Sequence, residues 1–353
     1  MATALCACLL VAPTAQGKFL KAIWGPAELP PGNVNCPTPT DPCSAFPLYR
    51  DLGVGAFQFQ LHWNEVAPTR PRHPRDPADP AYRWAAADYI VGQAREYGIG
   101  LAALVARTPG WANGGRSWRW APTDPAAYAN FLYAASRRYP AIRRWMIWGE
   151  PSRAENFQPM RANSRRGPRR YAALLDRAYG ALKSVDRRNR VIGGMTFSAG
   201  TIFPNRFLDW LKLPGGRPPR MDLWGHNPFD GRYPRLQQDP IGHFRGFNDI
   251  DTLHAEIEST YRAGHRKVPR LWISEWTISD RPTPIFRGFH VSRREQAVRL
   301  NAAFTIARRT RYVAAFGWFT LMDQAAGEGS AGWGLLDAEG NRKPSFFTYR
   351  RLP

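Results

Sequence analysis

Two glutamates follow apolar, aromatic-rich runs of this 353-residue sequence, and their carboxyl groups are suited to acid–base and nucleophilic chemistry. Glu150 ends the run WMIWGE, and Glu275 ends the run LWISE. An ionisable side chain directly after an apolar strand is uncommon unless it is paired or does chemistry. The alternative for each residue is a buried ion pair with one of the many arginines. The occurrence of both at such positions favours a chemical role.

Retaining glycoside hydrolysis requires such a pair of carboxyl groups. One must be protonated to donate to the leaving oxygen, the other must be ionised to attack the anomeric carbon, and the two lie about 5–5.5 Å apart. The nearby negative charge raises the pKa of the acid, and this effect is relieved once the covalent intermediate forms. The same group can therefore act as acid in the first step and as base in the second.

The elements that must position these glutamates alternate along the chain. Short apolar runs predict eight strands, at 19–24, 56–61, 100–106, 144–148, 190–194, 221–226, 270–275 and 313–319. Apolar residues at three-to-four spacing and helix start signals predict helices, at 124–139, 171–185, 253–261, 295–307 and 345–352. Eight strands with helices between them are typical of the α/β class and of a single-domain (β/α)8 TIM barrel.

A doubly wound open sheet is the alternative architecture. It is disfavoured because no glycine-rich phosphate turn follows the first predicted strand, where Gly25 stands alone in WGP. In a barrel, chemistry takes place at the carboxyl ends of the strands. Glu150 follows the fourth predicted strand and Glu275 the seventh, so both are expected to reach one pocket at the barrel mouth.

Several motifs sharpen this interpretation. They are WNEVAP at 63–68, TPGWA at 108–112, IWGEP at 147–151 and GLLD at 334–337. Together they resemble glycoside hydrolase clan A, with the greatest similarity to family 39 and family 5-like proteins. The resemblance covers nearly the whole chain after the first residues. It implies a retaining hydrolase of β-linked oligo- or polysaccharides that needs no cofactor, with Glu150 as the acid/base and Glu275 as the nucleophile.

The resemblance also implies residues that bind the sugar. Trp318 matches the aromatic platform of the clan, Trp63 and Trp111 lie at the ends of the second and third strands, and His226 follows the sixth. For the tryptophans a place in the core or at the rim is the alternative, and for His226 a structural role. The seven histidines show no metal-ligand spacing, so no metal is expected.

One position departs from the clan pattern. Gly149 stands where the clan usually has an asparagine that binds the hydroxyl next to the anomeric centre. Asn64 and Asn227 are candidate replacements, although each could simply cap a turn. The departure motivates a second hypothesis, in which the protein is a weakened barrel that binds carbohydrate without cleaving it.

The N-terminal segment and the cysteines indicate a secreted protein. Residues 1–15 are apolar and small, as in a secretory signal peptide, although the basic start is missing, so residues 16–353 are expected to form the catalytic domain. Cys36 and Cys43 are expected to form a disulfide, with unpaired loop thiols as the alternative. No apolar run approaches the length of a membrane span.

The formal net charge of +21 is carried mostly by arginine. Such a charge attracts nucleic acid, anionic lipid or acidic polysaccharide. The arginines are spread along the chain, which favours a compositional bias, and the dense run at 165–170 is expected to be a loop that leads into a helix. No nucleic-acid-binding motif accompanies the charge, so nucleic acid is not an expected partner.

Overall fold

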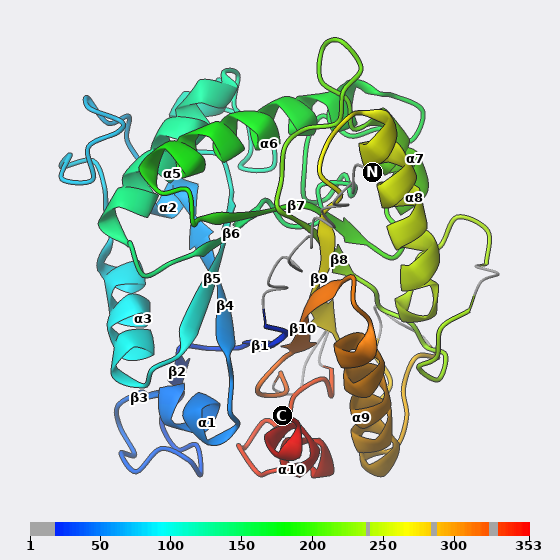
Figure 1. The fold of residues 1–353 in the computed structure, drawn as a ribbon. Coiled ribbons are helices and arrows are strands. Elements are labelled where there is room, and N and C mark those ends of the chain that lie inside the picture. The colour runs from blue at the N-terminus through cyan, green and yellow to red at the C-terminus, as the bar shows by residue number, and fades with distance from the viewer. Residues whose placement is uncertain (1–17, 238–240, 284–287, 325–330) are drawn as a thin grey trace, which may run out of the picture.

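The computed structural model describes residues 18–237, 241–283, 288–324 and 331–353. Its centre is a closed barrel of eight parallel strands in the order β1-β10-β9-β8-β7-β6-β5-β4 (Figure 1). The barrel strands are β1 (Leu20–Trp24), β4 (Ala56–His62), β5 (Gly100–Ala106), β6 (Arg144–Ile147), β7 (Arg190–Phe197), β8 (Leu223–Asn227), β9 (Arg270–Trp276) and β10 (Val313–Phe319). The predicted single-domain TIM barrel is confirmed.

Helices surround the barrel on its outer side (Figure 1). The longer ones are α1 (Phe46–Asp51), α3 (Ala85–Glu96), α5 (Pro125–Arg138), α6 (Arg166–Val185), α7 (Pro204–Trp210), α8 (Ile250–Ala263), α9 (Arg293–Arg309) and α10 (Pro344–Arg351). Single-turn helices α2 (Trp63–Val66), α4 (Gly110–Asn113) and η1 (Phe247–Asp249) lie in loops. No helix in the described part of the chain is long and apolar enough to cross a membrane.

The structure corrects one local expectation, that residues 165–170 form a loop. Helix α6 begins at Arg166 and includes most of this run. Gly167 permits the early start, because a Cβ at this position would lie 2.3 Å from the carbonyl oxygen of Pro159. The first turn of α6 can therefore pack directly against the loop that follows β6.

Two buried tyrosines connect the outer helices to the ends of the strands. The hydroxyl of Tyr128, on α5, donates to the carbonyl oxygen of Val105 at 2.7 Å. The hydroxyl of Tyr171, on α6, donates to the carbonyl oxygen of Ile147 at 2.6 Å. A buried hydroxyl needs a hydrogen-bond partner. Each tyrosine hydroxyl has one in a strand carbonyl oxygen, and the bond fixes the end of that strand. The carboxyl ends of β5 and β6 are thereby held by the helix layer.

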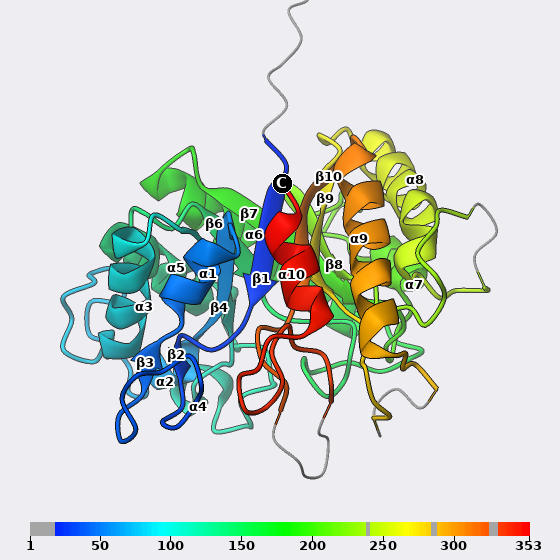
Figure 2. The same cartoon turned by 90° about the horizontal axis from the view of Figure 1, so that it is seen from below.

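The last helix closes the ring, as predicted, by packing beside β1 (Figure 2). The ammonium of Lys21 donates to the carbonyl oxygens of Leu352 at 2.6 Å and Tyr349 at 3.1 Å. The Tyr349 hydroxyl donates in return to the carbonyl oxygen of Ala22 at 2.9 Å. Burial lowers the pKa of Lys21 to about 8.

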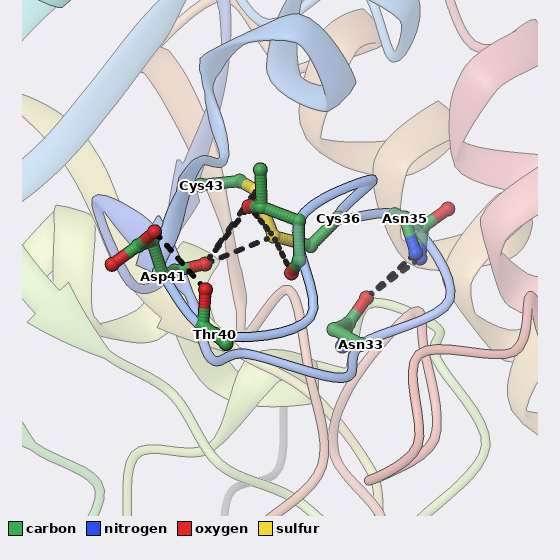
Figure 3. The surroundings of a disulfide bond; sticks show 7 residues. Asn33, Asn35, Cys36, Thr40, Asp41 and Cys43 are labelled. Atoms are coloured by element: carbon green, nitrogen blue, oxygen red, sulfur yellow. Dashed lines mark hydrogen bonds between the residues drawn. A yellow bond between two sulfur atoms is a disulfide. The ribbon is translucent and has the colours of Figure 1, made fainter.

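A small antiparallel sheet of β2 (Glu28–Leu29) and β3 (Cys43–Ser44) lies outside the barrel. The expected disulfide between Cys36 and Cys43 is present, with their Cα atoms 5.5 Å apart (Figure 3). The bond closes the loop that leads into β3. Residues 1–15, the expected signal peptide, lie outside the described residues.

Candidate active site

A cleft of about 400 Å³ opens at the carboxyl ends of the barrel strands. Both predicted glutamates, Glu150 and Glu275, line it. Its other walls are largely aromatic and arginine-bearing, and include Gln60, Leu104, Ala106, Arg107, Trp118, Trp148, Arg153, Asn156, Phe197, Phe229, Phe319 and Trp333. A concave site with an aromatic lining and a few convergent polar groups is the usual form of a small-molecule site.

Glu150 is fixed by three side-chain donors. Its Oε2 accepts from the guanidinium of Arg153 at 2.7 Å and from the amide of Asn156 at 3.1 Å. Its Oε1 accepts from the amide of Asn227 at 3.0 Å. The Glu150 side chain is only 12% exposed, so these contacts replace most of its hydration. The ion pair considered from the sequence alone is therefore present, but within the cleft.

The backbone beneath the cleft adopts an uncommon conformation. Arg107, Trp148 and Glu150 all have positive φ angles, of 65°, 66° and 44°. An L-residue in this left-handed region costs roughly 1–2 kcal/mol. Such residues tend to gather at functional sites, where surrounding contacts compensate the cost. Here the Trp148 amide donates to the carbonyl oxygen of Val105, and its indole donates to the carbonyl oxygen of Asn156.

Asn227 links the two carboxyl groups. It is the last residue of β8, it is 1% exposed, and its carbonyl oxygen accepts from the Ser198 hydroxyl. Its side-chain amide donates to Glu150, and a hydrogen bond from the same side chain also lowers the pKa of Glu275. Asn227 therefore lies beside both carboxyl groups.

The pKa of Glu275 is raised to about 8. Burial is the main cause, because it disfavours the charged carboxylate, and the negative charge of Glu150 acts in the same direction. The charge of Arg153 and the hydrogen bond from Asn227 oppose the rise. The carboxyl pair therefore holds a proton near neutral pH.

The aromatic wall formed by β10 differs from the expectation by one residue. Trp318 is fully buried, its indole donates to the carbonyl oxygen of Thr320, and its ring packs 5.9 Å from that of Trp276. Phe319 lines the cleft instead. Successive side chains of a strand point to opposite sides, so a shift of one residue replaces a side chain that faces the core by one that faces the cleft.

Trp63 and Trp111 lie outside the cleft of the glutamates and line a neighbouring pocket of about 330 Å³. Trp63 is fully buried, with its ring 5.5 Å from that of Trp111. Asn64 also lies outside the cleft lining; its backbone amide donates to the carbonyl oxygen of Arg107, and its side-chain oxygen is buried without a partner among the described residues. Of the two candidate asparagines, only Asn227 reaches the carboxyl pair.

His226 has a structural place. It is fully buried, and its ring contacts Thr196 at Nδ1 and the carbonyl oxygen of Arg245 at Nε2. Burial lowers its pKa to about 4, so the ring is neutral at physiological pH. Both nitrogens are occupied, which corrects the expectation that His226 contacts the sugar.

Solved structures of glycoside hydrolases share this architecture over nearly the whole chain. A family 39 glycoside hydrolase from Bacteroides cellulosilyticus WH2 superposes with a TM-score of 0.65 at 17% identity, over 95% of this chain and 63% of that chain. The chain has the fold of family 39 glycoside hydrolases. No family model and no curated protein matches the sequence.

Two further solved structures share this fold. A monomeric beta-xylosidase from Caulobacter crescentus CB15 has a TM-score of 0.61 at 18% identity, over 94% of this chain and 67% of that chain. A beta-glucuronidase 2 from Bacteroides uniformis has a TM-score of 0.57 at 14% identity, over 95% of this chain and 34% of that chain. At these identities the similarity establishes the fold alone.

Several residues of the cleft had no predicted role. Arg153 lies three residues after Glu150, and this spacing was the available signal for its contact. Arg107 and Trp118 belong to the long loop after β5, which has no periodicity to indicate where its side chains point. No group of three His, Cys, Asp or Glu side chains in the described ranges is placed to hold a metal ion.

Proposed function

We propose that the protein is a retaining glycoside hydrolase of β-linked oligo- or polysaccharides, with Glu150 as acid/base and Glu275 as nucleophile. The observation that carries the proposal is that both carboxyl groups line one cleft, beside Asn227, whose side chain donates to Glu150 and lowers the pKa of Glu275. Direct attack requires the two carboxyl groups to lie about 5–5.5 Å apart, whereas inverting enzymes separate them by about 6.5–9.5 Å. The shared fold of family 39 hydrolases supports the same reaction.

In the first step the ionised Glu275 attacks the anomeric carbon while Glu150 gives its proton to the glycosidic oxygen. The carbon–oxygen bond to the leaving group breaks, and a glycosyl ester forms on Glu275. In the second step Glu150 takes a proton from water, the resulting hydroxide attacks the anomeric carbon, and Glu275 leaves as a carboxylate. Asn227 can stabilise either carboxylate by its amide, and so serves both steps.

The roles of the two glutamates can be tested separately by chemical rescue. Glu150→Ala is expected to lower kcat about 10²–10⁴-fold on substrates with poor leaving groups, and less on activated aryl β-glycosides. Azide should restore activity and give the β-glycosyl azide, because it attacks the covalent intermediate. Glu275→Ala with azide should instead give the α-glycosyl azide, because azide replaces the nucleophile.

Glu96→Gln is the matched control. Glu96 is an exposed glutamate at the end of α3 and does not line the cleft. Its substitution should leave kcat unchanged. Retention of full activity in Glu275→Ala, or the same azide anomer from both variants, would contradict the assignment.

Gly149 favours a second candidate function, that of a barrel that binds carbohydrate without cleaving it. The position beside Glu150 has no side chain to hold the neighbouring sugar hydroxyl, and the amide nitrogen of Asn227 already donates to Glu150. In that case oligosaccharides would bind the wild-type protein, and no β-glycoside would be hydrolysed.

We also propose that the protein acts outside the cytoplasm. Disulfides persist mainly in oxidising compartments, and the Cys36–Cys43 bond supports this location. The proposal that residues 1–15 form a signal peptide is tested by N-terminal sequencing of the secreted protein.

A further inference from the structure

One wall of the cleft is formed by a loop rich in arginine and tryptophan. This loop, residues 107–120, follows β5 and is called the Arg–Trp loop below. Its Trp118 lines the cleft, with the guanidinium groups of Arg107 and Arg119 at 5.0 and 5.2 Å from its ring centre. Further along the loop, the guanidinium of Arg116 lies 4.3 Å from the ring centre of Trp120. Cations are therefore placed beside aromatic rings at successive points of this loop, of which Arg107 and Trp118 line the cleft.

The positive charge of the Arg–Trp loop is poorly neutralised. Arg107 contacts Glu65, a carboxylate that is itself 61% exposed. Arg116 and Arg119 are exposed and have no carboxylate partner within the described residues. By contrast, Arg220 forms a close ion pair with Asp176 at 2.7 Å. Unpaired cations beside a cleft attract anionic ligands into it.

The loop also connects two cavities. Its start and Trp118 line the cleft of the glutamates, whereas Trp111 lines the neighbouring pocket of about 330 Å³. Arg70 lies across that second pocket, with its guanidinium 5.5 Å from the Trp111 ring centre, and it too lacks a carboxylate partner in the described ranges. The combination of ring and cation thus recurs beyond the catalytic cleft.

We infer that the ligand of this cleft is an anionic glycan, a β-linked polysaccharide bearing carboxylate or sulfate groups, which binds along the Arg–Trp loop. The inference rests on the proposed function for its assumption that the cleft takes a sugar chain. Indole rings pack against the apolar faces of pyranoses, and guanidinium groups bind carboxylate or sulfate oxygens with paired donors. Recurrence of this arrangement over two cavities favours a polymer over a single charged sugar.

The test is direct binding to the full-length protein carrying Glu275→Gln, which prevents turnover during the titration. Three hexamers of one backbone serve as probes in calorimetric titrations: cellohexaose, its analogue made of β-1,4-linked glucuronic acid, and 6-O-sulfated cellohexaose. We expect at least one acidic hexamer to bind roughly tenfold or more tightly than cellohexaose at low salt. This advantage should shrink as salt rises, because salt screens exposed charges. The tighter of the two acidic probes identifies carboxylate or sulfate as the recognised group.

Variants of the loop separate recognition from general charge. In the same Glu275→Gln background, Arg107→Gln, which removes a cleft-lining guanidinium, should weaken binding of the acidic hexamer about fivefold or more and leave cellohexaose unchanged. Trp118→Ala should weaken all three probes. Arg308→Gln is the matched control, because Arg308 is an exposed arginine near the end of α9 that lines neither cavity. Its loss should change no affinity.

Several outcomes would overturn the inference: equal affinity for the neutral and acidic hexamers, no binding of any probe at millimolar concentration, or equal effects of Arg107→Gln and Arg308→Gln. Binding of a single-stranded oligonucleotide as tightly as the acidic hexamer would point to nucleic acid instead. Hydrolysis by the wild-type protein is measured separately. Acidic hexamers that bind but are not cleaved would defeat the proposed function and leave the inference intact. Cleavage of neutral glycans without any preference for acidic ones would support the proposed function and overturn the inference.

Discussion

The ion pair between Arg153 and Glu150 makes a quantitative prediction about the carboxyl pair. Arg153 is one of two groups that hold down the pKa of Glu275, which burial and the charge of Glu150 raise to about 8. Substitution of Arg153 by glutamine removes a positive charge while keeping a polar side chain of similar length. The pKa of Glu275 should then rise further, because its ionised form loses a stabilising charge.

The size of this rise follows from Coulomb's law. A unit charge several ångströms away, at an effective dielectric of about 20, contributes on the order of 3 kcal/mol. Arg153 is 34% exposed, so solvent screens part of this interaction. Roughly half of that value corresponds to about one pKa unit. Since Glu275 must be ionised to attack, the acidic limb of the profile of kcat/KM against pH should move about one unit towards higher pH in Arg153→Gln.

The assay is the pH dependence of kcat/KM on an aryl β-glycoside, which reports the free enzyme. Arg153→Lys keeps the charge and should move the limb much less. Carbon-13 NMR of the labelled glutamate carboxyls gives the same pKa without relying on activity. A limb and a Glu275 titration that stay in place, or that move to lower pH, in Arg153→Gln would refute this electrostatic reasoning.

Three further predictions concern single positions. Gly149→Asn should fold with Tm changed by less than about 3 °C, because a Cβ there meets only Leu104 side-chain atoms at 3.4 Å or more. The variant should raise kcat/KM on aryl β-glycosides roughly tenfold, because the new side chain restores a hydrogen-bond donor to the sugar. A lower Tm in thermal unfolding or a lower kcat/KM would contradict this prediction. His226 is neutral when folded, with a pKa of about 4 against 6.5 unfolded, so its contribution to stability is complete above pH 6.5 and is lost as pH falls towards 4. In urea titrations the free energy of unfolding of wild type should therefore fall by up to ~3 kcal/mol more than that of His226→Gln over this range, and parallel pH curves would argue against it. Cys36→Ser removes the bond to Cys43, which closes a loop with a sequence separation of 7, and should lower the free energy of unfolding by ~2.5 kcal/mol; a wild-type Tm insensitive to reductant would count against this.

The barrel was predictable because buried parallel strands are apolar along their whole length. Runs such as Gly100–Ala106 and Val313–Phe319 therefore had unambiguous ends, which the structure reproduces. Strand β7 instead continues to Phe197, three residues past its predicted end, through the glycine pair of GGMTF. Helix α6 begins at Arg166, before the first residue of the apolar pattern that predicted it. Gly167 allows this early start because it lets the first turn pack against the loop after β6, a contact that the apolar pattern does not encode.

The candidate site was predictable where it lies on strands and much less where it lies on loops. Glu150 and Glu275 follow strands whose ends are fixed by the barrel, so their convergence followed from topology. Trp118 and Arg153 lie on loops, whose paths depend on contacts that no local pattern encodes. The cleft is lined by Phe319 and not by the predicted Trp318. Successive side chains of a strand point to opposite sides, so an error of one residue assigns the wrong side chain to the cleft.

The tyrosine contacts beneath the cleft have an evolutionary consequence. Tyr128 and Tyr171 belong to helices on the outside of the molecule, yet their hydroxyls hold the backbone from which Arg107 and Glu150 project. A change in how either helix sits would shift those side chains without altering any residue that meets the ligand. Sequence drift on the outer surface is thus a source of new selectivity, and laboratory selection for altered substrates should include these helices among its targets.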